Sequence, residues 1–316
     1  MRTDNGISLV INTKNEEKNI KSCILSARDI VDEIIVVDMM SSDKTVELAK
    51  EMGAKVYHFK DYGHAEPARN FALSKPTMKW SLVLDGDERL TKQLRRKIKQ
   101  LAKSDKYDGF KFPFKNILLG KWIKHSMWWP DYHIRLFKTG HLDWPTGVHQ
   151  DQIFKGRVFK LEAAEENAFV HYNIADIKEL LQMINDYSSV EATFKSKKTT
   201  AYDLVDYLEH EFRWRYFEHK GYLDGMHGYI LAKFMNVYRL LEVAKLWERE
   251  GYKEYFSHTQ LKHAAEQREF VEDASLKGAR ENLEKIEELR SVVEGFRKDL
   301  EKIQSSKFYK FWQYYC

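Results

Sequence analysis

Short apolar runs alternate with amphipathic segments through the N-terminal part of the chain. The apolar runs predict buried strands, and they cover residues 7–12, 33–38, 55–59 and 80–85. Between them apolar residues return every three or four positions, which predicts helices. These helices cover residues 16–31, 45–52 and 65–74. Alternation at this spacing predicts a parallel α/β sheet, and ligands of such sheets bind beyond the carboxyl ends of the strands.

The pattern changes after the fourth strand. Residues 107–172 combine Pro, His and four tryptophans in an irregular order, which indicates a loop-rich, aromatic-lined half domain. Residues 174–250 return to helical periodicity. From Ile286 to Ile303 apolar residues recur at alternating spacings of three and four, which is a short heptad seam. Residues 308–315 are mainly aromatic and include one lysine.

Composition narrows the class of protein. With 43% hydrophobic and 32% charged residues in 316, the chain is globular. The 52 basic and 48 acidic residues give a net charge of +4, which argues against nucleic acid as a partner. The two cysteines are too few for a disulfide framework and lack the spacing of a zinc site. This cysteine content is compatible with a reducing cytoplasm. No window reaches the ~18 apolar residues of a spanning helix, so we expect a cytoplasmic protein, with peripheral contact to the inner face of the cytoplasmic membrane left open.

The strongest chemical signal is Asp85-Gly-Asp87 at the end of the fourth strand. Two carboxylates one residue apart can hold a hard divalent cation, which neutralises a diphosphate as a bond to it breaks. Asp-Gly-Asp is also ordinary turn chemistry. Its place beside the polar ends of the first two strands favours the metal site.

Four motifs in order resemble the nucleotide-binding half of family 2 glycosyltransferases. They are Ser8–Glu16, Asp32–Thr45, Ala68–Leu73 and Leu84–Glu88. Further along, three stretches are similar to one branch of this family, the lipopolysaccharide core β-1,4-glucosyltransferases. They are Asn116–His125, Trp129–Phe137 and Val148–His149. The resemblance implies a GT-A fold and an inverting transfer of a sugar from a nucleotide donor.

The resemblance and the periodicity together divide the chain. We expect a GT-A catalytic domain over 1–172, with a nucleotide-binding half at 1–108 and an acceptor half at 109–172. A helical extension follows over 173–250, and a helical tail over 251–316. The tail could join two chains through its seam, or contact an anionic membrane through its aromatic end.

The resemblance also assigns the nucleotide pocket. It implies that Thr13, Asn15 and Glu16 line the pocket, that Asp38 reaches the base or ribose, and that Arg69 lies near the base or phosphates. Thr13 and Asn15 could also cap the first helix, which is compatible with a ligand role. Arg69 could alternatively be a surface ion-pair partner.

For the metal, magnesium or manganese, the resemblance implies Asp87 as a direct ligand, with Asp85 on the metal or the ribose. His149 is a further metal or phosphate ligand or, alternatively, a core histidine.

Inversion requires a base for the acceptor hydroxyl. Asp131, in Trp-Trp-Pro-Asp-Tyr, falls where the family's catalytic carboxylate falls, and we expect its aromatic neighbours to raise its proton affinity. An Asp after Pro is also a common turn residue. Arg135 either pairs with Asp131 on a helix or contacts the diphosphate.

The resulting hypothesis is an inverting transferase that moves a hexose, glucose by resemblance, from a UDP-sugar to a lipid-linked or surface glycan such as lipopolysaccharide core. The alternative is a non-catalytic nucleotide-sugar-binding scaffold with a degenerate GT-A domain. A nucleotidyltransferase is disfavoured because Thr13–Glu17 is not a glycine-rich, basic phosphate loop.

Overall fold

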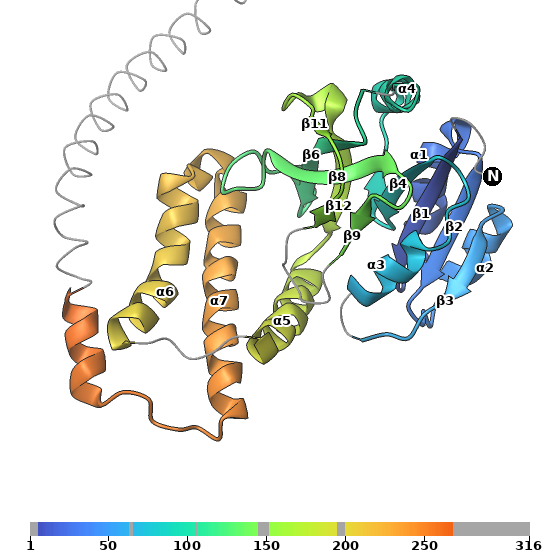
Figure 1. Ribbon diagram of the computed structural model, residues 1–316. Coiled ribbons are helices and arrows are strands. Elements are labelled where there is room, and N and C mark those ends of the chain that lie inside the picture. The colour runs from blue at the N-terminus through green and yellow to red at the C-terminus, as the bar shows by residue number, and fades with distance from the viewer. Residues whose placement is uncertain (1–5, 63–65, 105, 145–151, 195–199, 268–316) are drawn as a thin grey trace, which may run out of the picture. The chain divides into compact units, whose positions relative to one another are not determined.

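Four parallel strands form the N-terminal half of the sheet. The computed structural model describes residues 6–62, 66–104, 106–144, 152–194 and 200–267. The strands are β1 (Ile7–Thr13), β2 (Glu33–Asp38), β3 (Lys55–His58) and β4 (Trp80–Asp85). They run in the order β3-β2-β1-β4 (Figure 1). All four strands expected from the sequence are confirmed.

Helices cover both faces of these strands. They are α1 (Ile20–Ala27), α2 (Thr45–Glu51), α3 (Glu66–Leu73) and α4 (Lys92–Leu101). Leu9 and Ile11 pack in the core that α1, α2 and α4 share, whereas Val10, between them, packs in the core of α3. Successive side chains of a strand point to opposite faces. Because both faces are covered, the central strands are mainly apolar.

The second half of the sheet corrects the expectation of a loop-rich region at 107–172. Long strands β6 (Gly109–Leu118), β8 (Asp131–Lys138) and β12 (Phe169–Ile174) continue the same sheet in the order β4-β8-β6-β12-β5. The short strands are β5 (Glu88–Arg89), β7 (Lys121–Trp122), β9 (Leu142–Asp143), β10 (Ile153–Phe154) and β11 (Val158–Lys160). β8 is antiparallel to β4 and β6, and β12 is parallel to β6.

Aromatic packing explains why these strands form despite their mixed sequence. Phe112 and Phe114 of β6 lie with their ring centroids 5.1 and 5.2 Å from that of Phe169 on β12. All three rings are buried. The resulting mixed, mainly parallel sheet with flanking helices is the α/β architecture expected of the GT-A class.

Three longer helices follow the sheet, as the periodicity of 174–250 predicts. They are α5 (Ile177–Phe194), α6 (Ala201–Arg213) and α7 (Met226–Arg249). A π-helical turn η3 (Trp214–Glu218) and a 3-10 turn η4 (Gly221–Asp224) join α6 to α7. Ile184 of α5 and Leu231 of α7 share a small core with Leu118 at the end of β6.

The described residues belong to two compact units. Those before 195, together with Tyr207–Lys253, form the first, and 200–206 with 254–267 belong to the second. Every residue of the site described below is in the first unit. In the described ranges no helix is long and apolar enough to cross a membrane. The seam at 286–303 and the aromatic end at 308–315 lie outside these ranges, so the tail's dimer and membrane contacts stay predictions.

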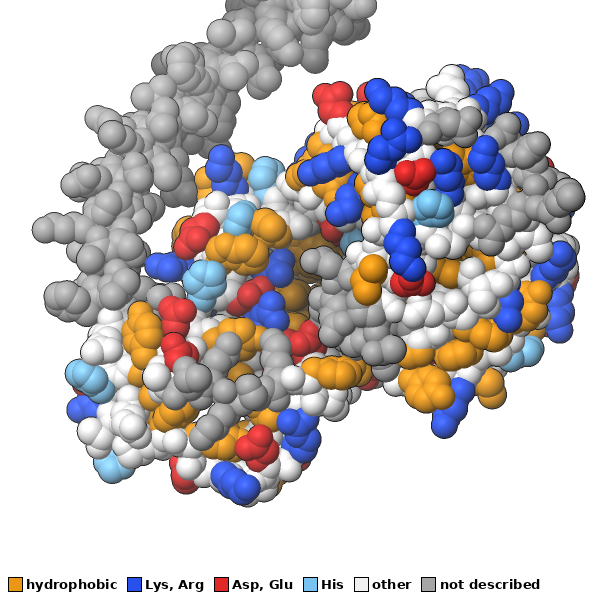
Figure 2. Space-filling view, viewed as in Figure 1, with side chains coloured by type: hydrophobic (Ala, Val, Ile, Leu, Met, Phe, Trp, Pro, Cys, Tyr) orange, Lys and Arg blue, Asp and Glu red, His pale blue; other side chains and the backbone are white. Residues whose placement is uncertain are grey.

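The surface reflects the near-balance of charge in the sequence. Acidic and basic side chains are interspersed over the visible face, with more basic ones near α4 (Figure 2). α4 has the sequence Lys-Gln-Leu-Arg-Arg-Lys-Ile-Lys-Gln-Leu, which contains five basic and no acidic residues. Leu94 and Ile98 of this helix are buried, whereas Lys92, Arg96 and Lys99 lie on its exposed face.

Candidate active site

The polar ends of the parallel strands meet at one edge of the sheet. In the strand register Thr13 lies opposite Asp38, and Asn12 lies opposite Asp85. The Asp38 carboxylate accepts a hydrogen bond from the Ser41 N–H at 3.2 Å. It also lies 3.3 Å from His58 Nδ1. The structure therefore brings Thr13, Asp38 and Asp85 together, as a parallel sheet requires.

Asn15 and Glu16 connect the loop after β1 to the loop after β2. Asn15 has a φ of 56°, a left-handed conformation that Asn tolerates better than most residues. Its Oδ1 accepts from the Ser42 N–H at 2.8 Å. The Glu16 N–H donates to Thr45 Oγ1 at 2.7 Å. These bonds fix the polar rim above β1 and β2.

Neither Thr13 nor Asn15 caps the first helix. α1 begins at Ile20, and its N-cap residue is Asn19. Glu16 instead accepts a hydrogen bond from Asn19 Nδ2 at 2.8 Å. Burial raises the pKa of Glu16 to about 7, an effect that this hydrogen bond opposes.

Two arginines hold Asp85. Its Oδ2 accepts from Arg69 Nη2 at 3.1 Å and from Arg135 Nη2 at 3.0 Å. The Arg69 guanidinium also lies 5.2 Å from the ring centroid of Trp144. Burial alone would raise the pKa of Asp85, but the two guanidinium groups outweigh it and hold that pKa well below its usual range. Asp85 is therefore an anion already matched by two cations.

Arg135 corrects one of the two alternatives drawn from the sequence. It lies on strand β8, not on a helix, and its guanidinium pairs with Asp85 and Glu88 instead of Asp131. Glu88 is fully buried and also accepts from the Asp85 N–H at 3.0 Å. Burial raises the pKa of Glu88 to about 7, although the charge of Arg135 opposes this. Its role in holding Arg135 is not visible in the sequence.

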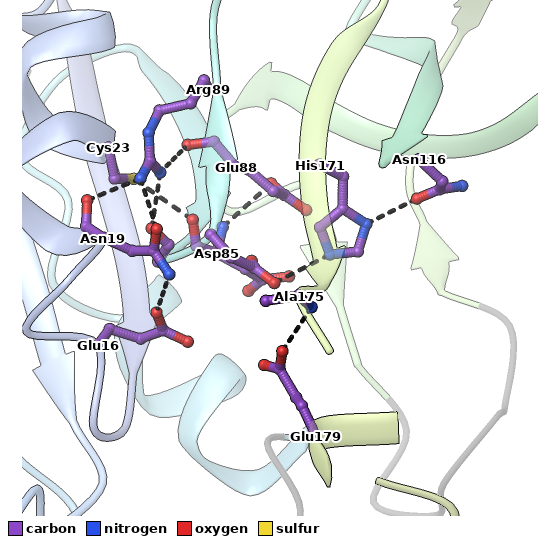
Figure 3. Close-up of polar contacts among 12 residues, drawn as sticks. Glu16, Asn19, Cys23, Asp85, Glu88, Arg89, Asn116, His171, Ala175 and Glu179 are labelled. Carbon is purple, nitrogen blue, oxygen red and sulfur yellow. Dashed lines mark hydrogen bonds and ion pairs between the residues drawn. The ribbon is translucent and has the colours of Figure 1, made fainter. Parts of the chain in front are cut away.

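Asp87, the second carboxylate of the motif, has a different partner. His171 of β12 places its Nε2 3.1 Å from Asp87 Oδ2. Its Nδ1 lies 2.8 Å from Asn116 Oδ1 (Figure 3). Asn116 Nδ2 donates to the Trp128 carbonyl at 3.0 Å, which fixes the orientation of the amide. The Asn116 oxygen therefore faces His171 as an acceptor, and Nδ1 must carry a hydrogen.

This hydrogen-bond order leaves Nε2 of His171 aimed at the Asp87 carboxylate. Two acceptors cannot face each other at hydrogen-bond distance without a positive charge between them, either a proton on Nε2 or a cation. Burial lowers the pKa of His171, but Asp87 and the neighbouring carboxylates outweigh it and raise that pKa to about 9. A histidine whose other nitrogen is bound by an amide oxygen is a common metal-ligand arrangement.

The pair fits a cation that is shared with its substrate. Among the described residues no three His, Cys, Asp or Glu side chains converge into a ready-made metal cluster. Mg²⁺, however, is commonly held by one or two carboxylates plus substrate phosphates and water. Asp87 and His171 are therefore the residues that would hold the metal, whereas Asp85 is engaged by its arginines.

His171 is a site residue that the sequence did not identify. His149, named instead, lies outside the described residues. Only the sheet register, with His171 opposite both Asn116 and Glu88, brings His171 to the Asp-Gly-Asp motif. A histidine in a strand of mixed polarity gave no signal by itself.

Asp131 lies at the first position of β8, opposite Phe114 of β6. Its side chain is 39% exposed, and its Oδ2 lies 3.1 Å from His133 Nε2. Burial favours the neutral form, but the hydrogen bond and charge of His133 outweigh it, so the pKa of Asp131 is lowered. The expectation of a raised proton affinity is wrong because a polar neighbour, not an aromatic ring, dominates this carboxylate.

Of the four tryptophans, Trp129 lies two positions before Asp131 and Trp122 packs against Trp129, whereas Trp144 is a core residue. Trp122 and Trp129 meet edge to face with their centroids 5.2 Å apart. The Nζ of Lys124 lies 4.2 Å from the Trp122 ring centroid. Trp144 is buried and packs with α3. The first two rings therefore form a partly exposed aromatic wall on the side of Asp131.

The comparisons with known proteins agree with this geometry. A family model described as "Glycosyl transferase family 2" matches residues 8–167, half of the chain. The chain belongs to glycosyl transferase family 2. It is thus a transferase enzyme, and the expected family and GT-A architecture are confirmed.

Two proteins of similar sequence match this chain over most of their length. An "Uncharacterized glycosyltransferase" of Rickettsia felis is 28% identical over 258 residues, which covers 77% of this chain and 89% of the relative. The lipopolysaccharide core biosynthesis glycosyltransferase LpsC of Rhizobium meliloti is 26% identical over 257 residues, covering 78% and 94%. Among solved structures, S. aureus TarS residues 1–349 in complex with UDP covers 79% of this chain and 93% of its own, with a TM-score of 0.42 and 15% identity.

Proposed function

We propose that this family 2 glycosyltransferase moves a hexose, glucose, from a UDP-sugar to a lipid-linked or cell-surface glycan such as lipopolysaccharide core, with inversion at the anomeric carbon. The observation that carries the proposal is the separation of two carboxylate systems at one sheet edge. Asp85 and Asp87 lie with arginines and a histidine on the donor side, and Asp131 lies on β8 beside the aromatic wall. Similarity to LpsC supports the acceptor class.

On the donor side, fixed charges suit a nucleoside diphosphate. Thr13, Asn15 and Glu16 line the pocket rim, and Asp38 is placed to meet the ribose or base. Arg69 is partly exposed, at 19% of its side chain, so it can turn from Asp85 toward a phosphate. Arg135, by contrast, is buried and locked by two carboxylates, so it orients Asp85.

The metal would be held by Asp87 and His171, with Asn116 fixing the imidazole. When bound, magnesium or manganese would neutralise the charge that develops on the departing diphosphate. A chain of hydrogen bonds connects the donor side to the loop before Asp131. It runs from Asp87 through His171 and Asn116 to the Trp128 carbonyl.

Transfer requires one base on the acceptor side. Asp131 takes the proton of the acceptor hydroxyl while that oxygen attacks the anomeric carbon from the face opposite the leaving group. The bond from carbon to the diphosphate oxygen breaks, and its electron pair stays on UDP. Because the pKa of Asp131 is lowered, the carboxylate is ionised and ready at neutral pH.

Thermal stabilisation by a panel of nucleotide sugars tests the proposal. A ligand that binds only the folded state stabilises it by RT ln(1 + [L]/Kd), about 2.7 kcal/mol at 100 times Kd. We expect UDP-glucose to raise Tm in the presence of Mn²⁺, and to raise it much less with EDTA. Asp87→Ala should remove the metal-dependent part.

Two results would overturn the proposal. One is stabilisation by another nucleotide and not by UDP. The other is equal stabilisation with and without metal. Release of UDP on addition of core lipopolysaccharide separates an enzyme from a scaffold that binds without turnover.

A further inference from the structure

The loop that leads into Asp131 is held from the helical extension. Asp224, the last residue of η4, is 4% exposed. Its carboxylate accepts from the His125 N–H at 2.8 Å and from the Lys124 N–H at 3.2 Å. The Asp224 carbonyl accepts from Lys121 Nζ at 2.8 Å. One buried side chain thus fixes two consecutive amides of the segment between β7 and β8.

The next residue of the loop is bound by the same part of the chain. Ser126 is fully buried. Its N–H donates to the His219 carbonyl at 2.9 Å, and its hydroxyl donates to the Arg215 carbonyl at 3.0 Å. Its own carbonyl accepts from Arg215 Nη1 at 2.9 Å. All polar groups of Ser126 therefore pair with residues between α6 and α7.

The backbone of this loop needs such support. Ser126 and Met127 have φ values of 56° and 68°, a left-handed conformation that residues with a side chain rarely adopt. Two such residues in succession persist only where the surroundings determine them. The contacts to Asp224, Arg215 and His219 are these surroundings.

Close packing of the helical extension makes the support rigid. A Cβ on Gly221 would lie 2.2 Å from Ser126 Oγ and 2.8 Å from the Arg215 carbonyl. A Cβ on Gly228 would lie 1.8 Å from the Gly221 carbonyl oxygen. Only glycine fits at either position, so η4 packs at van der Waals distance against Ser126 of the loop, and α7 packs in the same way against η4.

From the loop, the constraint passes along the chain to Asp131, whereas Asn116 and His171 on the donor side are also held by the register of β6 and β12. The Trp128 N–H donates to the His125 carbonyl at 3.0 Å, and the Trp128 carbonyl accepts from Asn116. Asn116 in turn holds His171. Trp129 and Pro130 then lead directly to Asp131 at the start of β8.

We propose that Asp224 is a positioning residue for transfer, which fixes the loop 124–130 and through it the place of Asp131 against the acceptor hydroxyl. The inference rests on the proposed function, in which Asp131 is the base. It assigns to the helical extension, through this loop, an indirect part in the chemistry.

The test compares Asp224→Asn with a matched control, Glu242→Gln. The asparagine side chain would keep the size of the aspartate but present an N–H₂ to one of the two backbone N–H groups. Glu242 is also a buried carboxylate of the helical extension, 1% exposed, but it pairs with Arg239 on α7 and Tyr207 on α6. Both variants lose a buried charge, so stability alone does not distinguish them.

Three readouts are made on full-length protein. Hydrogen exchange follows the amides of 124–130, calorimetry follows UDP binding with Mn²⁺, and UDP release from UDP-glucose is measured with core lipopolysaccharide. For Asp224→Asn we expect faster exchange in the loop and a kcat at least about tenfold lower, with UDP affinity and the KM for UDP-glucose within about twofold of wild type. Glu242→Gln should leave loop exchange and kcat unchanged.

The proposal is overturned if Asp224→Asn shows hydrogen exchange in the loop and a kcat equal to those of wild type. It is also overturned if kcat falls equally in Asp224→Asn and Glu242→Gln. Loss of UDP binding in Asp224→Asn also overturns it, because the effect would then be global. Asp131→Asn is assayed in parallel, so that a failure of the positioning proposal can be told apart from a failure of the proposed function. If Asp131→Asn transfers at the wild-type rate, the base assignment itself is wrong.

Discussion

The donor and acceptor sides of the site hold their carboxylates in opposite ways. Asp85 and Glu88 are enclosed with Arg135, whose side chain is 6% exposed, and each charge has an opposite charge within hydrogen-bond distance. Asp131 is partly open to solvent and lies beside His133 and Asn116. The first arrangement resists change, and the second leaves a carboxylate with lone pairs available for a substrate.

The contrast shows which residues can act on a substrate. A carboxylate that two guanidinium groups already bind contributes by fixing geometry, whereas Asp87 and Asp131 can accept a new partner. The two groups should also differ in whether a substitution lowers stability or activity. Changes to the enclosed donor-side group should unfold or loosen the protein, and a change at Asp131 should leave the fold intact.

The largest expected effect is on stability. Arg135→Met would leave the buried Glu88 and the half-buried Asp85 without their shared cation, and breaking a buried pair by removing one partner costs about 3–5 kcal/mol. Urea unfolding followed by circular dichroism measures it. A loss below about 1 kcal/mol would show that the two carboxylates are not held by Arg135 in solution.

Asp131→Asn should give the complementary result. Loss of a general base lowers turnover by about 100-fold or more. Because the side chain is partly exposed, we expect the free energy of unfolding to change by less than about 1 kcal/mol. Steady-state UDP release and urea unfolding of the same preparation provide both numbers, and a large loss of stability would mean that Asp131 is mainly structural.

The stability contributed by Glu16 should depend on pH. Its pKa is raised to about 7 in the folded protein from an ordinary 4.5, so the folded state binds more protons than the unfolded state between these values. Stability contributed by the protonated carboxyl is therefore complete below pH 4.5 and is lost as pH rises to about 7, by roughly 3 kcal/mol. Glu16→Gln, which mimics the protonated form, should be less sensitive to pH over this range.

Tm measured from about pH 4.5 to about pH 8 for both proteins checks the prediction. Parallel curves for the wild type and Glu16→Gln would show that burial does not perturb this group.

The smallest effect belongs to an exposed pair. Lys21 and Glu51 lie 2.8 Å apart with side chains 46% and 51% exposed. Exposed pairs are worth about 0–1 kcal/mol, so Lys21→Ala should be close to neutral in urea unfolding. If its cost matched that of Arg135→Met, burial would not be what distinguishes the donor-side pairs.

Sequence periodicity was sufficient for the N-terminal half of the fold. β1, β2 and β4 are mainly apolar because helices cover both faces, and their polar ends indicate the site. β6 and β8 mix Phe with Lys, Pro, Asn and Asp, and their stability depends on rings from distant segments, such as Phe169 against Phe114. Local pattern does not contain that information.

The site shows the same limit. Asp85 and Asp87 could be selected from a motif of three residues. His171 meets Asp87 across 84 positions, and Asp224 meets Lys124 across 100. Such pairs depend on sheet register and helix packing. The pKa of Asp131 depends on His133 two positions away, but only the strand geometry shows that their side chains face each other.

The central claim is that donor binding and acceptor activation belong to different carboxylates. Titration calorimetry of UDP into wild type, Asp87→Ala and Asp131→Asn, each with and without Mn²⁺, tests it most directly. We expect metal-dependent UDP binding in wild type and Asp131→Asn, and none in Asp87→Ala. Unchanged binding in Asp87→Ala, or its loss in Asp131→Asn, would contradict the account.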